Sequence, residues 1–368
     1  MTTTQQLKDL GQSLWLDNIT RGILADGTLR RYISDLAVTG LTSNPTIFDE
    51  AIKKSSFYDD AIGKKIAAGG SGEALFFELA LEDLTQAADL FRPAYDASGG
   101  LDGWVSLEVS PLLANDTAGT IKAARQLHAR AQRANLFIKI PGTPAGITAI
   151  EESIFAGIPV NVTLLFSPEQ YVAAAEAYLR GIERRLGAGL DPNVRSVASL
   201  FISRWDVAVK DKVPSALRNR LGIAVAKLAY QDYRKLLEAP RWRKLAAAGA
   251  QPQRLLWAST GTKDPAAPDT LYVQALAAPD TINTMPEKTL LAFADHGKVL
   301  GAMPVDGGDA EQVLKEFAHD GVDQAQLAAQ LQHEGAESFT KSWRSLMDVV
   351  AAKSAVLATV EQKSAGRR

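Results

Sequence analysis

The chain has 368 residues, of which 46% are hydrophobic and 22% are charged, a composition that is ordinary for a globular protein with a sizeable core. Its formal net charge of -2 argues against a nucleic acid or an anionic membrane surface as the main partner, although a small anionic ligand needs only two or three local cations. The absence of cysteine excludes disulfides, thiolate nucleophiles and zinc–thiolate sites.

Targeting signals are not evident in the sequence. Residues 1–10 are polar and lack the apolar segment of a signal peptide. No apolar run is long enough to span a bilayer. We therefore expect a cytoplasmic protein with no membrane partner.

Short apolar runs alternate with helix-length segments along most of the chain. The runs that predict strands lie near residues 13–17, 38–44, 105–110, 136–140, 159–165, 197–203, 254–259 and 281–284. Helix starts are also marked. Ser167, Pro168 and Gln170 form an N-cap, a first-turn proline and a capping box, and Thr284 three residues before Glu287 predicts a second capping box.

Eight strands that alternate with helices predict a parallel α/β sheet. The number fits a closed (β/α)8 TIM barrel, which we expect over residues 12–300. The rival is a doubly wound open sheet, which usually has a glycine-rich turn after its first strand. Here the first strand ends in Asp17-Asn18, with no such glycines.

The C-terminal part of the chain changes character from about residue 306. Helical spacing of apolar residues recurs over 313–317, 327–331 and 339–346. We expect additional C-terminal helices over residues 306–363 that pack on the barrel, so that residues 1–368 form a single domain.

Polar residues recur on one side of five predicted strands. Alternate residues of a strand face opposite sides of the sheet, and the side that is wholly apolar fits contact with the helices. Val160, Val162 and Leu164 belong to such an apolar side. The sides expected to face the barrel interior carry Trp15 and Asp17; Thr42 and Asn44; Trp104, Ser106 and Glu108; Phe137 and Lys139; and Asn161, Thr163 and Leu165.

The polar residue on each inner side lies at or near the C-terminal end of its strand, where barrel enzymes place their active sites. Lys139 is the most informative of them, because a lysine inside an apolar strand is costly unless it is paired or deprotonated. A partly desolvated amine with a lowered pKa is the nucleophile that Schiff-base chemistry requires.

Each of these residues also has a purely structural interpretation. Lys139 could form a structural ion pair with Glu108 or Asp17. Asp17 could cap a helix, and Asn44 before Pro45 could mark a turn. Two carboxylates and two amides in phase on neighbouring strands favour a site over these separate explanations.

At these residues the sequence resembles the transaldolases, specifically the longer branch with extra C-terminal helices, and the resemblance covers nearly the whole chain. The segments that carry it are Trp15-Leu16-Asp17, Gly40-Leu41-Thr42-Ser43-Asn44-Pro45-Thr46, Ser106-Leu107-Glu108-Val109, Ile138-Lys139-Ile140-Pro141-Gly142-Thr143 and Asn161-Val162-Thr163-Leu164-Leu165-Phe166. The second and fifth of these are specific to the family.

The resemblance implies catalytic roles for four residues. Lys139 matches the lysine that forms the Schiff base. Asp17 matches the acid/base that acts on the C4 hydroxyl during carbon–carbon cleavage. Glu108 matches the acid/base that works through a water held with the help of Thr163.

The resemblance also implies a substrate pocket. Asn44 and Asn161 match the amides that bind donor hydroxyls, and Thr42 lines the same pocket. In the segment 199–204, Ser199 matches a substrate-binding serine and Arg204 a phosphate-binding arginine. Phe201 stands where relatives that release dihydroxyacetone tend to carry tyrosine, and those relatives tend to carry glutamine at the Glu108 position.

The sequence departs from the family pattern after the seventh strand. Many members carry Ser-x-Arg there, but this chain has Ser259-Thr260-Gly261. Lys263 lies two residues later. It either supplies the missing cation, together with Ser259 and Arg204, or is a solvated loop lysine.

The implied reaction moves a dihydroxyacetone unit from sedoheptulose 7-phosphate or fructose 6-phosphate to glyceraldehyde 3-phosphate or erythrose 4-phosphate, in the pentose phosphate pathway. It requires no metal and no cofactor. One alternative is a class I aldolase that resembles fructose 6-phosphate aldolase; another is a phosphosugar-binding barrel without catalysis. The expected partners are phosphosugars, with no nucleic acid, and the expected state is a monomer or homodimer.

Overall fold

A closed parallel barrel forms the centre of the molecule. The computed structural model describes residues 2–365, with side chains as far as residue 359. Within these residues, eight strands pair in sequence order and the last closes on the first, which confirms the predicted (β/α)8 TIM barrel. The strands are β1 Ser13–Leu16, β2 Val38–Leu41, β3 Val105–Glu108, β4 Leu136–Pro141, β5 Val160–Leu165, β6 Ser196–Phe201, β7 Gln253–Ala258 and β8 Ile282–Met285.

Helices follow each strand and surround the barrel, because only the helices can bury the apolar outer sides of the strands. The helices are α1 Thr3–Asp9, α2 Arg21–Ala25, α3 Thr28–Asp35, α4 Pro45–Lys54, α5 Asp59–Ala67, α6 Gly72–Ala97, α7 Thr117–Ala131, α8 Pro144–Phe155, α9 Pro168–Gly187, α10 Ser203–Val209, α11 Leu221–Glu238, α12 Pro240–Ala247, α13 Leu271–Ala275, α14 Glu287–His296, α15 Ala310–His319 and α16 Gln324–Ala365. None of these helices, within the described part of the chain, is long and apolar enough to cross a bilayer.

The buried apolar residues divide into two clusters, as the alternation along the strands predicts. One cluster lies between strands and helices and includes Leu14 and Leu16. The other includes the inward-facing Trp15, Trp104 and Phe137. The rings of Trp104 and Phe137 are stacked with their centroids 4.0 Å apart. These aromatic residues precede the polar positions on the same strands, so they fill the barrel below the strand ends.

The alternation fails at the end of β5. Leu164 has a left-handed backbone with φ +59°, and the register between β5 and β6 shifts between Val162 and Leu165. Leu165 therefore joins the outer cluster and Leu164 the inner one, so the predicted sides of these two residues are wrong. The physical reason is the irregular backbone at Leu164, which interrupts the two-residue period of an extended strand.

One predicted helix start is confirmed and the other is wrong. Ser167 caps α9 by accepting a hydrogen bond from the Gln170 backbone N–H, with Pro168 in the first turn. Thr284 does not cap α14, which begins after Pro286 without a side-chain cap. The Thr284 hydroxyl instead bonds the hydroxyl of Thr42 inside the barrel.

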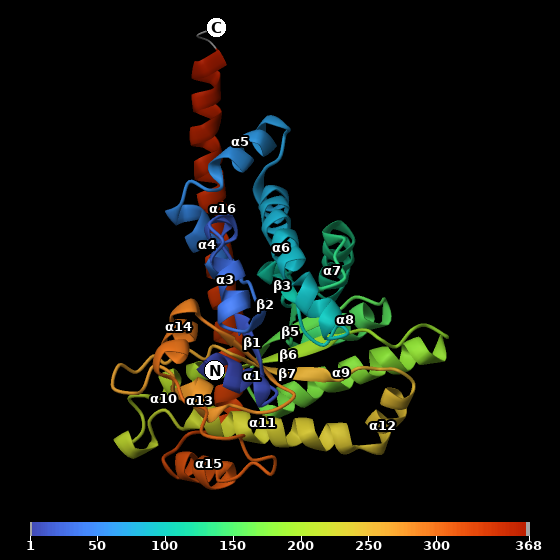
Figure 1. Cartoon of the computed structure of the whole chain (residues 1–368), viewed down its shortest axis with the longest axis vertical. Helices are drawn as coiled ribbons and strands as arrows, with labels where there is room; N and C mark the ends of the chain where they lie inside the picture. Colours follow the sequence, from blue (N-terminus) through green and yellow to red (C-terminus); the bar gives the residue numbers. More distant parts are fainter. Residues whose placement is uncertain (1, 366–368) are drawn as a thin grey trace.

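The C-terminal part of the chain forms α15 and the long α16. The two helical patterns expected over 327–331 and 339–346 belong to the single helix α16. Figure 1 shows α16 rising from the barrel as the longest helix, with α4 and α5 beside it, and α16 packs against both. It also contacts β5 and α10, so it passes over the C-terminal ends of the strands.

Candidate active site

A cavity of about 300 Å³ opens at the C-terminal ends of the barrel strands, and we call it the strand-end cavity. Ten of the residues predicted for the site line it: Asp17, Thr42, Asn44, Lys139, Thr163, Ser199, Phe201, Arg204, Ser259 and Lys263. The other two, Glu108 and Asn161, contact lining residues from behind the cavity wall. The topology of a parallel barrel explains the convergence, since all strands end at the same rim.

Lys139 is buried at the centre of the site. It is paired in register with Glu108 on the neighbouring strand, and its Nζ lies 3.1 Å from Oε2 of Glu108. The amine also donates a hydrogen bond of 3.1 Å to the backbone carbonyl oxygen of Ser43. The ion pair considered from the sequence therefore exists, and it joins the amine to a carboxylate at the edge of a cavity.

Glu108 is buried, and its carboxylate oxygens accept no hydrogen bond of good geometry from the described residues. Burial raises the pKa of Glu108 above its ordinary value, the charge of Lys139 opposes that rise, and the charge of Asp17 adds to it. A carboxyl group whose pKa is raised keeps its proton to higher pH than an ordinary glutamate, which suits it to act as a general acid.

Thr163 adds a second unsatisfied polar group near the lysine. Its hydroxyl is fully buried and has no hydrogen-bond partner within residues 2–365. Thr163 pairs in register with Pro141, two residues beyond Lys139 on β4. Because Lys139 also pairs with Glu108, the three residues lie on adjacent strands.

Asp17 lies directly after β1, where its side chain reaches the cavity. Its Oδ1 accepts a hydrogen bond of 2.8 Å from the Thr42 hydroxyl. It does not cap the next helix, since Thr20 caps α2. Burial raises the pKa of Asp17, while the charges of Lys139 and Lys263 and the bond from Thr42 oppose that rise.

Two amides flank the cavity in fixed orientations. The Asn44 Oδ1 accepts a hydrogen bond of 3.1 Å from the Ile47 backbone N–H and caps α4. The segment therefore caps a helix and is not a turn, and Asn44 lines the cavity while its oxygen is held by the cap. Asn161 donates to the hydroxyl of Ser106 at 3.0 Å and accepts from that of Ser199 at 2.7 Å.

The cationic end of the cavity lies after β6 and β7. Arg204 has no hydrogen-bond or ion-pair partner among residues 2–365, and burial lowers the pKa of its guanidinium. Ser259 has a left-handed backbone with φ +57°, and its hydroxyl bonds that of Ser203 at 2.9 Å. Lys263 is exposed to solvent but borders the cavity. A Cβ built on Gly261 would lie 3.7 Å from the Lys263 Nζ, so the amine lies close to the loop backbone.

Sequence reasoning missed six of the residues that line the cavity, and two of them, Thr284 and Phe339, contact predicted site residues. Thr284 bonds Thr42, and extending the alternation to the eighth strand would have found it, because Ile282 and Thr284 share the inward side. Phe339 of α16 lies with its ring centroid 5.8 Å from the Lys139 Nζ. The spacing of Phe339 within α16 indicates an ordinary core residue, so the local sequence does not indicate that Phe339 lines the cavity.

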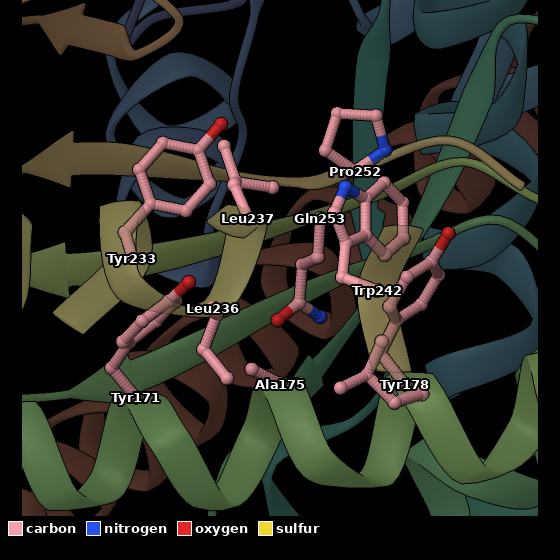
Figure 2. A pocket seen from close by; sticks show the side chains of 10 residues that line it. Tyr171, Ala175, Tyr178, Tyr233, Leu236, Leu237, Trp242, Pro252 and Gln253 are labelled. Carbon is pink, nitrogen blue, oxygen red and sulfur yellow. The ribbon is translucent and has the colours of Figure 1, made fainter. Parts of the chain in front are cut away.

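Figure 2 shows a second hollow, between α9, α11 and α12. Tyr171, Tyr178, Tyr233 and Trp242 line it, and none of its lining residues is an acid, a lysine, an arginine or a histidine. Gln253 lies at the start of β7, so this hollow is at the opposite end of the strands from Lys139. This hollow lacks the amine and the carboxyl groups that line or border the strand-end cavity.

Among residues 2–365, no three histidine, aspartate or glutamate side chains are placed to hold a metal ion together. His296 lies at the surface between Asp269 and Asp295, at 2.8 and 3.1 Å. The arrangement at the strand ends is that of a buried amine with two carboxyl groups near it.

Comparisons with known proteins agree with this geometry. The family described as Transaldolase/Fructose-6-phosphate aldolase matches residues 14–350. A protein named Transaldolase from Arthrobacter sp. (strain FB24) is 46% identical over 355 residues, covering 94% of this chain and 96% of that protein. Another from Parafrankia sp. (strain EAN1pec) is 46% identical over 360 residues, with 94% and 97% covered. Transaldolase 2 of Nostoc sp. (strain PCC 7120 / SAG 25.82 / UTEX 2576) is 42% identical over 327 residues, with 84% and 86% covered.

The family match includes every strand except the first residue of β1, and it extends into α16. It contains Lys139 and the residues that surround it in the cavity. The fold, the site geometry and the relatives all lead to the same assignment: the chain belongs to the transaldolase/fructose-6-phosphate aldolase family.

Proposed function

We propose that this protein is a transaldolase, a transferase that moves a dihydroxyacetone unit between phosphosugars through a Schiff base on Lys139. The single observation that carries this proposal is the buried Lys139 amine, which is 3.1 Å from Glu108 and lines the same cavity as Asp17. One amine nucleophile and two acid–base groups with raised pKa values are what the reaction needs.

The first stage joins the donor to the enzyme. The Lys139 amine attacks the ketone carbon C2 of the donor, and the carbinolamine that forms loses its hydroxyl as water to give an iminium. Glu108 gives the proton for that loss and takes it back when the product iminium is hydrolysed. The Glu108 Oε1 and the Thr163 hydroxyl have no hydrogen-bond partner among the described residues, which supports a shared role in holding that water.

The second stage breaks a carbon–carbon bond. The iminium acts as an electron sink, so cleavage between C3 and C4 leaves an enamine rather than a free carbanion. Asp17 removes the proton of the C4 hydroxyl and later returns it to the aldehyde oxygen of the acceptor. The hydrogen bond from Thr42 holds the Asp17 carboxylate at the cavity wall.

The remaining polar residues orient the substrate. We assign Asn44 and Asn161 to the donor hydroxyls, with Thr42 and Ser199 beside them. The phosphate lies at the cationic end, held by Arg204, Ser259 and Lys263. Arg204 supports this assignment best, because its half-buried guanidinium lines the strand-end cavity beside the rings of Phe201 and Phe339 and makes no hydrogen bond or ion pair with residues 2–365, which leaves its donors available to an anion.

Two alternatives remain distinguishable by experiment. A class I aldolase would release dihydroxyacetone instead of transferring it; Glu108 and Phe201, in place of the glutamine and tyrosine of such relatives, favour transfer. A binding barrel without catalysis would have no use for a buried amine between two carboxyl groups. We propose the pentose phosphate pathway and the cytoplasm as the setting, with the whole chain acting as one domain in a monomer or homodimer.

A coupled assay tests the proposal directly. Fructose 6-phosphate is supplied with or without erythrose 4-phosphate, and the glyceraldehyde 3-phosphate that appears is measured. A transaldolase turns over rapidly only when the acceptor is present. Equal rates without the acceptor, with free dihydroxyacetone accumulating, would assign the aldolase activity; no turnover and no covalent adduct would leave a binding protein.

A further inference from the structure

Phe339 is the part of α16 that reaches the reactive amine. It is buried, its ring centroid lies 5.8 Å from the Lys139 Nζ, and the Arg204 guanidinium carbon lies at the same 5.8 Å distance from that centroid. Its ring also meets the ring of Phe201 at 6.5 Å between centroids. Phe339 thus forms an apolar wall of the cavity between the nucleophile and the cationic end.

The helix that carries Phe339 is fastened to the barrel before that residue. The Gln332 side-chain amide donates to the backbone carbonyls of Gly142 and Leu164 at 3.0 and 2.9 Å, at the ends of β4 and β5. A Cβ added to Gly335 would come within 2.9 Å of the Leu164 side chain and 3.3 Å of the Arg204 side chain, so the helix backbone packs closely against both.

The same helix is fastened again just after Phe339. Ser342 accepts a hydrogen bond of 2.8 Å from Thr46, and Trp343 packs edge-on against Phe76 with centroids 5.1 Å apart. Contacts on both sides hold the ring in place. Phe339 is therefore a fixed wall of the cavity in the folded protein.

We propose that Phe339 shields the enamine on Lys139 from solvent protons and thereby sets the balance between transfer and release of the dihydroxyacetone unit. This inference rests on the proposed transaldolase activity and names a specificity-determining residue for it. An apolar ring excludes water, and its electron-rich face stabilises the positive iminium nitrogen that precedes and follows the enamine.

The chemistry at stake is a competition at carbon C3 of the bound unit. In transfer, the C2–C3 electron pair of the enamine attacks the aldehyde carbon of the acceptor, and Asp17 protonates the aldehyde oxygen. In release, the same electron pair takes a proton from water, Asp17 gives the proton it took from the C4 hydroxyl to the hydroxide that remains, and the iminium is regenerated. Water then adds to C2, the C2–N bond breaks, and free dihydroxyacetone and the Lys139 ammonium result. Whichever electrophile reaches C3 first decides the product.

The test measures both products of this competition per active site. Fructose 6-phosphate is supplied in D2O, and glyceraldehyde 3-phosphate is removed by a coupled dehydrogenase. Dihydroxyacetone that carries one carbon-bound deuterium reports protonation of the enamine. A parallel assay with saturating erythrose 4-phosphate reports transfer. Both rates are divided by the amount of borohydride-trapped adduct, so that the fraction of folded enzyme cancels.

We expect Phe339→Ala to raise the ratio of release to transfer by about tenfold and Phe339→Leu by a smaller factor, since leucine restores part of the apolar cover. Thr340→Ala is the matched control, because Thr340 is the next residue of α16 and borders a different surface groove. It should keep the wild-type ratio.

An unchanged ratio in Phe339→Ala would overturn the inference even if both rates fall, because that pattern indicates a purely structural role. If Phe339→Ala does not fold, an unchanged ratio in Phe339→Leu overturns it equally. The proposed function fails in a different way, namely when the wild-type protein gives no trapped adduct or no transfer.

Discussion

Glu108 and Lys139 stand side by side at the same level of β3 and β4, and their charged ends meet with the Lys139 Nζ 3.1 Å from the Glu108 Oε2. Both side chains are buried, so little of the ion pair is in contact with solvent. Removing one partner would leave the other as an unpaired buried charge, which is costly. A neutral side chain of similar shape preserves the packing at such a substitution, and burial then favours the uncharged form of the remaining partner.

Asp17→Asn and Glu108→Gln should slow different stages of the reaction. Asp17→Asn should still form the Schiff base but slow carbon–carbon cleavage by about two to four orders of magnitude, the usual contribution of a general acid–base group. Glu108→Gln should instead slow formation of the adduct. Rapid quenching with borohydride at successive times separates the two stages. Near wild-type cleavage in Asp17→Asn would reduce Asp17 to a structural partner of Thr42.

The phosphate assignment predicts a specific change in KM. Arg204→Ala should raise KM for fructose 6-phosphate by at least about tenfold, since hydrogen bonds to charged groups typically contribute about 1.5–3 kcal/mol. Lys263→Ala should have a smaller effect, because its amine is exposed. Use of unphosphorylated dihydroxyacetone should change much less. Lys122→Ala, on the exposed side of α7, serves as the control.

One outcome would contradict the phosphate-binding role proposed for Lys263. If Lys263→Ala keeps the wild-type KM and inorganic phosphate inhibits it normally, Lys263 is a surface lysine. Only Arg204 and the loop backbone around Gly261 would then bind the phosphate.

Much of this site follows from the residue alternation within short strands. The inward positions of Trp15, Trp104 and Phe137 agree with the sequence pattern, because a regular strand has a fixed two-residue period. Leu164 lies outside that pattern, since a single left-handed residue changes which side the next ones face. No feature of the sequence indicates that this leucine has a left-handed backbone.

The contribution of α16 to the site could not be predicted for a different reason. Phe339 meets Lys139 although 200 positions separate them in the sequence, and only the docking of α16 on the strand ends brings them together. Thr284 shows the same limit at short range. Its spacing to Glu287 fits a capping box, but a tertiary hydrogen bond to Thr42 takes its hydroxyl.

Gly40→Ala should destabilise the barrel by roughly 1–3 kcal/mol, the usual cost of overpacking a tight core. A Cβ at this position would lie 2.6 Å from the Trp104 backbone oxygen and 2.7 Å from the Trp15 ring. The free energy of unfolding in urea measures the effect. Gly187→Ala is the control, because nothing lies within 4 Å of its added Cβ. Equal stability of the two variants would contradict the packing described here.

Asp206 should make the stability of the protein depend on pH in a defined window. Burial raises its pKa from 3.8 to about 6, against the lowering effect of hydrogen bonds from Tyr272, Leu221 and Gly222. The folded state therefore favours the protonated carboxyl. The protonated Asp206 stabilises the folded state fully below pH 4. This stabilisation, about 3 kcal/mol in total, is lost as the pH rises to about 6.

Asp206→Asn removes that titration. Thermal unfolding of both proteins between pH 4 and 7 should show that the wild type loses stability relative to the variant as the pH rises. The comparison uses the slope and not the absolute stability, because asparagine also changes the hydrogen bonds. Parallel pH profiles would show that Asp206 does not titrate in this range.

The central claim is that Lys139 carries the covalent intermediate, and one measurement tests it most directly. The wild type and Lys139→Met are incubated with fructose 6-phosphate, reduced with borohydride, digested and analysed by mass spectrometry. We predict that the wild type gains the mass of one reduced dihydroxyacetone unit on the peptide that contains Lys139, and that the folded variant gains none. An adduct on another lysine, or an adduct that persists in Lys139→Met, would contradict the account.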